Sequence, residues 1–405
     1  MLIKGEELNF TVPDSDDVPE RSDSAINEKY VKGEIRIVTE QARYPLDTIS
    51  SKIVVNEKYK LNPEYQRRHR WDNVKKSRLI ESLIINVPIP PIFLYEYDYS
   101  KYEVMDGLQR LTAIHEFYTN QFELEGLEQW PELIGRTYST LPEKIREGID
   151  RRYLSSFILL KETAKSDEEA TNLKQLVFER LNSGGVELAP QESRNALYNG
   201  PMNKLCLKLS LNEELCKLWG IPEPSEEELN GGSPSSERIE NDMFREMGDV
   251  ELVLRFFAYR QKHKLHKGTN LARYLDSYLR ASNNFDERTL QGLERLFLET
   301  IRLVYQTFEE KAFWLRRQKR KPTDTDKWNW RERATTTVYD PMMYVFSKYL
   351  KDKKLILRKK DILRKEVVTF YETNYDDFGG RNVNPSVLKK RDALFEQFLT
   401  KQLGI

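Results

Sequence analysis

Hydrophobic and polar positions follow two different patterns along the chain, and the change comes near residue 195. Before it, short runs rich in branched and aromatic residues predict strands, and apolar residues at helical spacing predict helices between them. The predicted strands are residues 34–38, 52–61, 92–97, 102–105 and 156–162, and the predicted helices are residues 74–86, 108–120 and 168–182. After residue 195 the spacing is that of long helices. The pattern predicts an α/β or α+β part followed by a mainly α-helical region.

Changes in composition suggest where the parts begin and end. Residues 1–30 are acidic and contain Pro and Ser, which is typical of a flexible leader. Residues 31–200 then form one expected domain, and residues 201–405 form a helical domain. Within the latter, residues 221–242 are rich in Pro, Gly and Ser and predict a flexible loop.

Charge and cysteine content exclude some classes of protein. Lys and Arg together number 65, as do Asp and Glu, so only local patches can argue for nucleic acid. Two cysteines without a Cys-x-x-Cys spacing indicate neither a disulfide framework nor a zinc site. Uncharged apolar runs fall short of the roughly 18 to 20 residues that a membrane span needs. We expect a cytoplasmic protein with no membrane partner.

The sequence "EVMDGLQRLTAI" places polar residues at a corner between a predicted strand and a predicted helix. Amides at such a helix start attract phosphate, and Gly107 lets the backbone approach a ligand closely. Asp106 could then hold Mg²⁺, Gln109 could position a water, and Arg110 could neutralise a phosphoryl group. The alternative is a tight turn in which Asp106 caps the helix and Arg110 makes a surface salt bridge.

A second polar stretch, "NPEYQRRHRW", follows the strand predicted at residues 52–61. Its Tyr65, Gln66 and Arg67 are phosphate or nucleic-acid ligands if they converge with the corner. They form an ordinary solvated basic edge if they do not.

A third polar stretch, "VFERLNSGGVELAPQESRNALYNG", places Arg180 and Asn182 at a helix end, before two consecutive glycines. These two residues are further ligand candidates. The alternative is a helix C-cap followed by an Asx-type turn.

The three stretches, in this order, resemble the N-terminal domain of the GmrSD-type modification-dependent restriction enzymes, a ParB/sulfiredoxin-like domain that also occurs in other phage-defence proteins. "NPEYQRRHRW" is similar to the family's Pro-x-Tyr-Gln-Arg segment, and "DGLQRLTAI" to its Asp-Gly-Gln-Gln-Arg signature. "SRLIESLIINVPIPPIFL" and "FERLNSGGVELAPQESRNALY" are similar to two further family segments. The resemblance covers about residues 44 to 200, and a weaker one reaches about residue 350.

The resemblance implies a ParB/sulfiredoxin-like α/β domain that binds and hydrolyses an NTP with Mg²⁺. The implied catalytic residues are Asp106, Gln109 and Arg110, with Asp106 also as the metal ligand. The implied nucleotide-binding residues are Tyr65, Gln66, Arg67, Gly107, Arg180 and Asn182. Leu108 departs from the signature, which has Gln there, so either this side chain faces the core or the site is weakened. We expect it to face the sheet.

Many members of this family add a C-terminal HNH-type nuclease, which needs a His to activate water and further ligands for a metal. The chain has four histidines, and none of them stands in such a setting near the C-terminus. We therefore expect no HNH nuclease in this chain and a separate nuclease or effector subunit as a partner.

A basic and aromatic stretch, "FWLRRQKRKPTDTDKWNWRER", is the best candidate for contact with DNA or RNA. Cationic groups neutralise phosphates and indoles stack on bases. The candidate residues are Arg316, Arg317, Arg320 and Trp328. The alternative is a solvated loop whose tryptophans anchor it to the helical core.

Three functions follow from these observations. The first is an NTP-binding and NTP-hydrolysing module of a bacterial phage-defence system. The second is a non-catalytic DNA-binding protein with a ParB-like fold. The third is a partner-binding subunit that keeps the fold without the chemistry.

Overall fold

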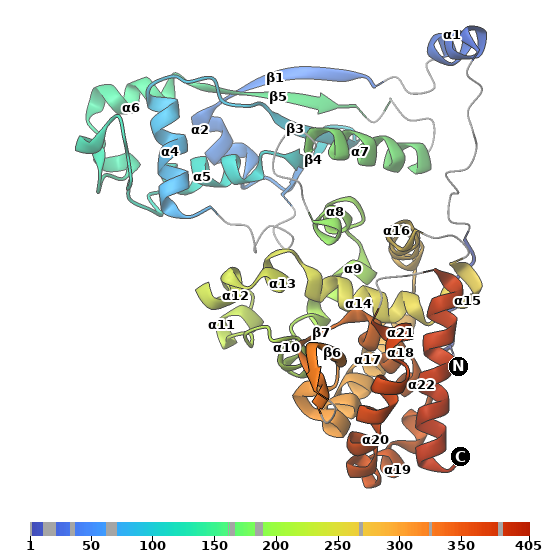
Figure 1. The fold of residues 1–405 in the computed structure, drawn as a ribbon. Helices are drawn as coiled ribbons and strands as arrows, with labels where there is room; N and C mark the ends of the chain where they lie inside the picture. Colours follow the sequence, from blue (N-terminus) through green and yellow to red (C-terminus); the bar gives the residue numbers. More distant parts are fainter. Residues whose placement is uncertain are drawn as a thin grey trace. The chain divides into compact units, whose positions relative to one another are not determined.

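The computed structural model describes residues 2–10, 22–32, 37–61, 71–160, 162, 167–182, 189–266, 270–323, 326–379 and 384–405. The chain forms two compact units. The sheet unit is Val18–Leu188, and the helical unit combines Met1–Asp17 with Ala189–Ile405. Figure 1 shows the strands β1 to β5 in the first and most of the helices in the second.

The sheet unit contains a mixed five-stranded sheet in the order β1-β5-β3-β4-β2. Its central strands β3 and β4 are antiparallel, whereas β3 with β5 and β4 with β2 are parallel pairs. The strands are β1 Thr39–Pro45, β2 Tyr59–Lys60, β3 Ile92–Asp98, β4 Lys101–Asp106 and β5 Tyr153–Leu159.

Helices pack against this sheet through one apolar core. Ile80 of α4, Ile114 of α5 and Ile92 of β3 are all fully buried in it. Each helix presents apolar residues at helical spacing to the core, which is why the sequence pattern located α4 and α5 well. The sheet unit contains the helices α1 Asp23–Lys32, α2 Leu46–Thr48, α4 Asn73–Ile84, α5 Leu108–Tyr118, η2 Pro131–Leu133, η3 Tyr138–Thr140, α6 Glu143–Asp150 and α7 Asp167–Asn182.

Three of the predicted strands differ from those in the structure. The strand predicted at residues 156–162 is β5, Tyr153–Leu159, which begins three residues earlier. The first strand is Thr39–Pro45, not residues 34–38, of which 34–36 lie outside the described part. Most of residues 52–61 is not strand either, because Ile49–Ile53 form a π-helix, η1, and only Tyr59–Lys60 pair with β4. Ile49 and Ile53 are buried on one helical side, so packing overrides the β-propensity of this run.

The helical unit is built around α14, whose side chains from Leu252 to Tyr259 are all buried. Helices α9, α16, α17 and α18 surround it, as the long helical patterns predicted. The longer helices are α8 Pro190–Leu197, α9 Pro201–Leu209, α10 Glu213–Trp219, α14 Gly248–Tyr259, α16 Leu271–Ser282, α17 Glu287–Phe308, α18 Thr336–Lys348, α20 Lys360–Thr373 and α22 Pro385–Leu403. The shorter ones are α11 Glu226–Leu229, α12 Ser236–Glu240, α13 Asp242–Arg245, α15 Lys262–Leu265, η5 Glu309–Lys311, η6 Leu350–Asp352, α19 Lys353–Arg358 and α21 Tyr375–Phe378.

Residues 2–10, part of the expected leader, lie in the helical unit instead. The carboxylate of Glu6 is fully buried and pairs with Arg260, whose Nε lies 2.6 Å from Oε1. Gln261 donates its side-chain amide to the carbonyl of Glu6 and accepts from the backbone amide of Leu8. These contacts fix a segment whose composition alone indicates mobility. Asp23–Lys32 is a helix, α1, in the sheet unit.

Residues 221–242, expected to be a flexible loop, contain the short helices α11 and α12. The side chains of Ser225 and Ser235 cap these helices by accepting backbone hydrogen bonds. Arg238 is fully buried, and its Nε lies 2.9 Å from Oε2 of Glu228. A single buried arginine therefore holds a stretch whose Pro, Gly and Ser content predicted a loop.

A two-stranded hairpin interrupts the helical unit. Its strands are β6 Trp314–Thr323 and β7 Asp326–Ala334, which pair antiparallel. The sequence pattern predicted no strand here, because its basic residues do not alternate with apolar ones. No helix in the described part of the chain is long and apolar enough to cross a membrane.

Candidate functional site

The corner at the end of β4 is the candidate site. Asp106 is the last residue of β4, Gly107 is the N-cap, and α5 begins at Leu108. Gly107 has φ 96° and ψ 10°, a left-handed conformation that side chains disfavour. A Cβ built there would lie 2.4 Å from Cγ2 of Ile92. The corner thus needs glycine for both its backbone angle and its close packing.

An ion pair spans this glycine. Nη2 of Arg110 lies 2.6 Å from Oδ2 of Asp106 and also donates to the carbonyl of Pro91 at 3.2 Å. The arginine side chain is 14% exposed and the aspartate side chain 45%. Nε of Arg110 is buried and has no hydrogen-bond partner among the described residues. The salt bridge of the alternative interpretation is therefore present, but its carboxylate stays open to solvent.

The first turn of α5 carries no capping side chain. Gly107 has none to offer, and the first turn contains no acidic residue. Asp106 pairs with Arg110 instead. Unpaired amides at a helix start, with the helix dipole behind them, favour an anion. The local geometry can accept a phosphate oxygen.

Gln109 connects the corner to the chain that enters α4. Its Oε1 accepts a hydrogen bond from the backbone amide of Trp71 at 3.2 Å. Tyr65, Gln66 and Arg67 lie outside the described residues. The described residues on either side of that stretch are Leu61, directly after β2, and Trp71.

Leu108 is the residue that departs from the signature. Its side chain is 6% exposed and belongs to the apolar core of the sheet unit. The first helical position faces the sheet, so the expectation for Leu108 is confirmed. The polar groups of the corner do not include this side chain.

Helix α7 carries the next predicted residues at its C-terminal end. Arg180 lies in its last turn and is exposed, and Asn182 is its last residue, with its side chain outside the description. Nζ of Lys174, earlier in α7, lies 2.6 Å from Oε2 of Glu103 in β4, and both side chains are largely buried. This ion pair holds α7 to the strand that ends at Asp106. No sequence signal pointed to it.

The end of the third stretch belongs to the helical unit. Arg194 of α8 is buried in the helical unit, where its Nη1 lies 2.7 Å from Glu251 and its Nε 2.6 Å from Asp276. Because these contacts tie α8 to the helices, the boundary between units comes at Ala189, earlier than the expected residue 200.

Metal binding at the corner depends on one carboxylate. In the described part of the chain, no three His, Cys, Asp or Glu side chains gather as a metal-binding group. Mg²⁺ in phosphoryl-transfer sites commonly uses only one or two protein carboxylates together with substrate phosphates and waters. The half-exposed carboxylate of Asp106 fits that mode.

The candidate nucleic-acid residues lie on the hairpin of the helical unit. Nη2 of Arg316 lies 2.7 Å from Oε1 of Glu372 in α20, so this guanidinium is engaged within the unit. The ring of Trp328 packs edge-on against Tyr375, with centroids 5.3 Å apart. Arg317 is exposed. The side chain of Arg320 lies outside the described residues.

The sheet unit is thus a mixed α/β domain in which a left-handed glycine joins the central strand β4 to the following helix α5. Residues 50–199 match the family described as "GmrSD restriction endonuclease, N-terminal domain". No curated protein and no solved structure matches the chain.

Proposed function

We propose that this protein binds an NTP together with Mg²⁺ at the Asp106 corner and hydrolyses it. The chain acts in phage defence without an HNH nuclease of its own and works with a separate nuclease or effector subunit. The observation that carries the proposal is the Asp106–Arg110 ion pair at the uncapped start of α5.

The residues of the corner divide the chemistry of phosphoryl transfer among them. Asp106 would hold Mg²⁺, which when bound neutralises charge on the phosphate oxygens. The amides at the start of α5 would receive phosphate oxygens, which Gly107 allows to approach. Arg110 would stabilise charge that develops on the transferred group. Gln109, held through its Oε1 by Trp71, keeps its amide NH₂ to orient a water.

The ion pair supports this proposal because a bound nucleotide and its Mg²⁺ would offer each of the two side chains a new partner of opposite charge. A phosphate oxygen can take the place of the Asp106 carboxylate on Arg110, and a cation can take the place of the guanidinium on Asp106. Arg110 also has a buried Nε without a partner in the described part of the chain. A buried donor without a partner costs about 1–3 kcal/mol, which an oxygen acceptor would recover.

DNA binding by the hairpin is the second candidate. Exposed Arg317 favours it, and the zero net charge of the chain does not. Two of its other candidate residues, Arg316 and Trp328, already contact helices of their own unit. The corner therefore has stronger support as the centre of function.

Phosphate release from each NTP, with Mg²⁺ and with or without DNA, tests the proposal. We expect release by the wild-type protein and a loss on the order of a thousandfold in Arg110→Ala, as for other arginines that stabilise phosphoryl transfer. Asp106→Ala should abolish phosphate release at every Mg²⁺ concentration.

Arg151→Ala is the matched control, because Arg151 is exposed in the same unit and follows α6, away from the corner residues in sequence. It should keep full activity. Undiminished phosphate release by Arg110→Ala would exclude the proposed chemistry.

A further inference from the structure

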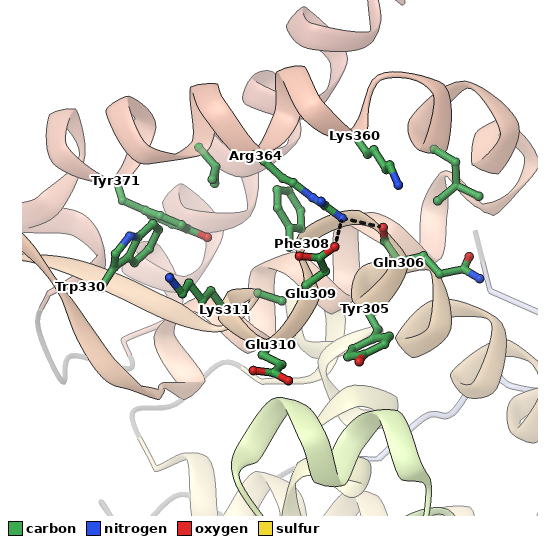
Figure 2. Close-up of a pocket in the computed structure, with 13 residues that line it drawn as sticks. Tyr305, Gln306, Phe308, Glu309, Glu310, Lys311, Trp330, Lys360, Arg364 and Tyr371 are labelled. Atoms are coloured by element: carbon green, nitrogen blue, oxygen red, sulfur yellow. Dashed lines mark hydrogen bonds and ion pairs between the residues drawn. The ribbon is translucent and has the colours of Figure 1, made fainter.

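The helical unit contains a cavity of about 930 Å³ that is separate from the corner. It lies between the C-terminal end of α17 with η5, one face of α20 and Trp330 of β7, as Figure 2 shows. Its size is within the range of small-molecule sites in proteins. All residues that line it belong to the described part of the chain.

One end of this cavity is aromatic. Trp330 of β7 and Tyr371 of α20 both line the cavity there (Figure 2). The guanidinium carbon of Arg316 lies 5.4 Å from the centroid of Trp330 and covers one face of the indole. The Arg316–Glu372 ion pair holds that cation in place. A flat ring entering the cavity can therefore pack on the indole of Trp330, which the contact with Arg316 holds in place.

The hydroxyl of Tyr371 is a buried polar group without a hydrogen-bond partner in the described part of the chain. Its residue is 1% exposed and lines the cavity. Burial raises the pKa of this hydroxyl, so it stays protonated and can donate. A buried hydroxyl in this state costs about 1–3 kcal/mol unless something in the cavity accepts its proton.

The cations of the cavity have different roles. Arg364 donates to the carbonyls of Thr307 at 2.6 Å and Gln306 at 3.2 Å, and it pairs with Glu309 at 3.0 Å. It therefore caps the C-terminal end of α17 and is neutralised there. Lys360, the first residue of α20, has no ion-pair partner among the described residues. The positive end of that helix adds to its charge.

Lys360 and Tyr371 lie on the same face of α20 at opposite ends of the cavity. They are eleven positions apart, or about 16 Å along a helix axis at 1.5 Å per residue. Figure 2 shows Lys360 on the other side of Arg364 from Tyr371 and Trp330. The two ends of the cavity thus favour different groups, an aromatic ring at one and an anion at the other.

We propose that this cavity binds an elongated small molecule with a planar aromatic ring at one end and an anionic group at the other. The ring packs on Trp330 and accepts a hydrogen bond from Tyr371, and the anion pairs with Lys360. Nucleotides and other aromatic acids both have this chemistry.

The test uses 4-methylumbelliferyl phosphate, whose planar ring system has a carbonyl acceptor at one end and a phosphate at the other, and follows its fluorescence on the full-length protein. We expect saturable binding with one site per chain. Lys360→Gln should weaken it roughly tenfold, and Tyr371→Phe roughly fivefold, as for a charged and a neutral hydrogen bond. Lys389→Gln, which removes an exposed lysine of α22, should leave the affinity unchanged.

Two further measurements complete the test. Without ligand, Tyr371→Phe should melt at the same or a higher temperature, because it removes a hydroxyl that nothing satisfies. AMP titrated against the bound probe, in an Asp106→Ala and Arg110→Ala background, identifies the source: displacement indicates a nucleotide and no displacement another aromatic acid. Equal probe affinity in the wild type, Lys360→Gln and Tyr371→Phe would overturn the proposal, as would an equal loss in Lys389→Gln.

Discussion

The guanidinium of Arg110 lies 2.6 Å from the carboxylate of Asp106, across the one glycine that separates β4 from α5. The pair is four positions apart, which is the spacing of an ordinary stabilising contact on a helix surface. Here, however, Asp106 precedes the helix and Arg110 is largely buried. The pair therefore links the end of β4 to the first turn of α5 and is not an ordinary ion pair on an exposed helix surface.

Replacing Gly107 tests how tightly the corner is built. Gly107→Ala forces a side chain into a left-handed conformation and against Cγ2 of Ile92 at 2.4 Å. We expect a loss of about 2–4 kcal/mol in the free energy of unfolding, from strain and overpacking together. Chemical denaturation measures it.

Gly148→Ala is the control for that substitution. Gly148 lies in α6, and an added Cβ would meet nothing within 4 Å. Alanine favours a helix over glycine, so this variant should be as stable as the wild type or up to about 1 kcal/mol more stable. Equal stability of the Gly107 and Gly148 variants would contradict the described corner.

Restoring the family's glutamine at position 108 should harm the protein. Leu108 is buried in the apolar core, so Leu108→Gln places an amide where the core offers it no partner. We expect a loss of about 2–4 kcal/mol in stability and no gain in phosphate release. A variant with higher activity would instead mean that position 108 contacts the nucleotide.

The stability cost of a substitution in the hairpin should depend on the contacts that the replaced residue makes. Arg316→Gln breaks the ion pair with Glu372, in which both side chains are mostly buried, and should cost about 1 kcal/mol. Glu372→Gln should cost the same, and the double variant little more. Arg317→Gln removes an exposed cation and should change stability by less than about 0.5 kcal/mol. If Arg316→Gln changes stability as little as Arg317→Gln does, the Arg316–Glu372 ion pair does not stabilise the hairpin.

Hydrophobic periodicity predicted most of the fold that positions the corner. The helices that begin at Asn73 and Leu108 and the strands β3 and β4 follow their patterns closely. The π-helix at Ile49–Ile53 was missed, because branched residues favour strands locally and only tertiary packing selects the helix. The hairpin was missed because its side chains are largely charged or aromatic rather than alternating.

The candidate site was predictable in part. The Asp-Gly sequence after a strand indicated the corner, and the structure places Asp106, Gly107, Gln109 and Arg110 there. The contacts of Pro91 and Trp71 to the corner join segments distant in sequence, and no local pattern encodes them. For the same reason, the burial of Glu6 by Arg260 contradicts what the composition of the N-terminal residues suggests.

Lys262 should add to the stability of the helical unit as the pH rises above about 8. Burial lowers the pKa of Lys262 to about 8, and the Asp392 carboxylate, 2.7 Å away, offsets only part of this effect. Between that value and the ordinary lysine pKa near 10.4, the unfolded chain binds more protons than the folded one, so stability rises with pH. The penalty of a charged Lys262 is present below pH 8 and is relieved above it.

Denaturation at pH 7.5 and 9.5 measures this difference. The wild type should gain about 2 kcal/mol relative to Lys262→Met over this interval. Lys264→Met, which removes an exposed lysine, should keep the wild-type slope. If the free energy of unfolding changes equally in the wild type and Lys262→Met between these two pH values, the pKa of Lys262 has the ordinary lysine value.

Isothermal titration calorimetry with Mg²⁺ and each NTP shows directly whether the Asp106 corner binds a nucleotide. We expect one site per chain in the wild type, with affinity weakened at least tenfold in both Asp106→Ala and Arg110→Ala and unchanged in Arg151→Ala. Binding that survives intact in both corner variants, or no binding of any NTP to the wild type, would contradict this expectation.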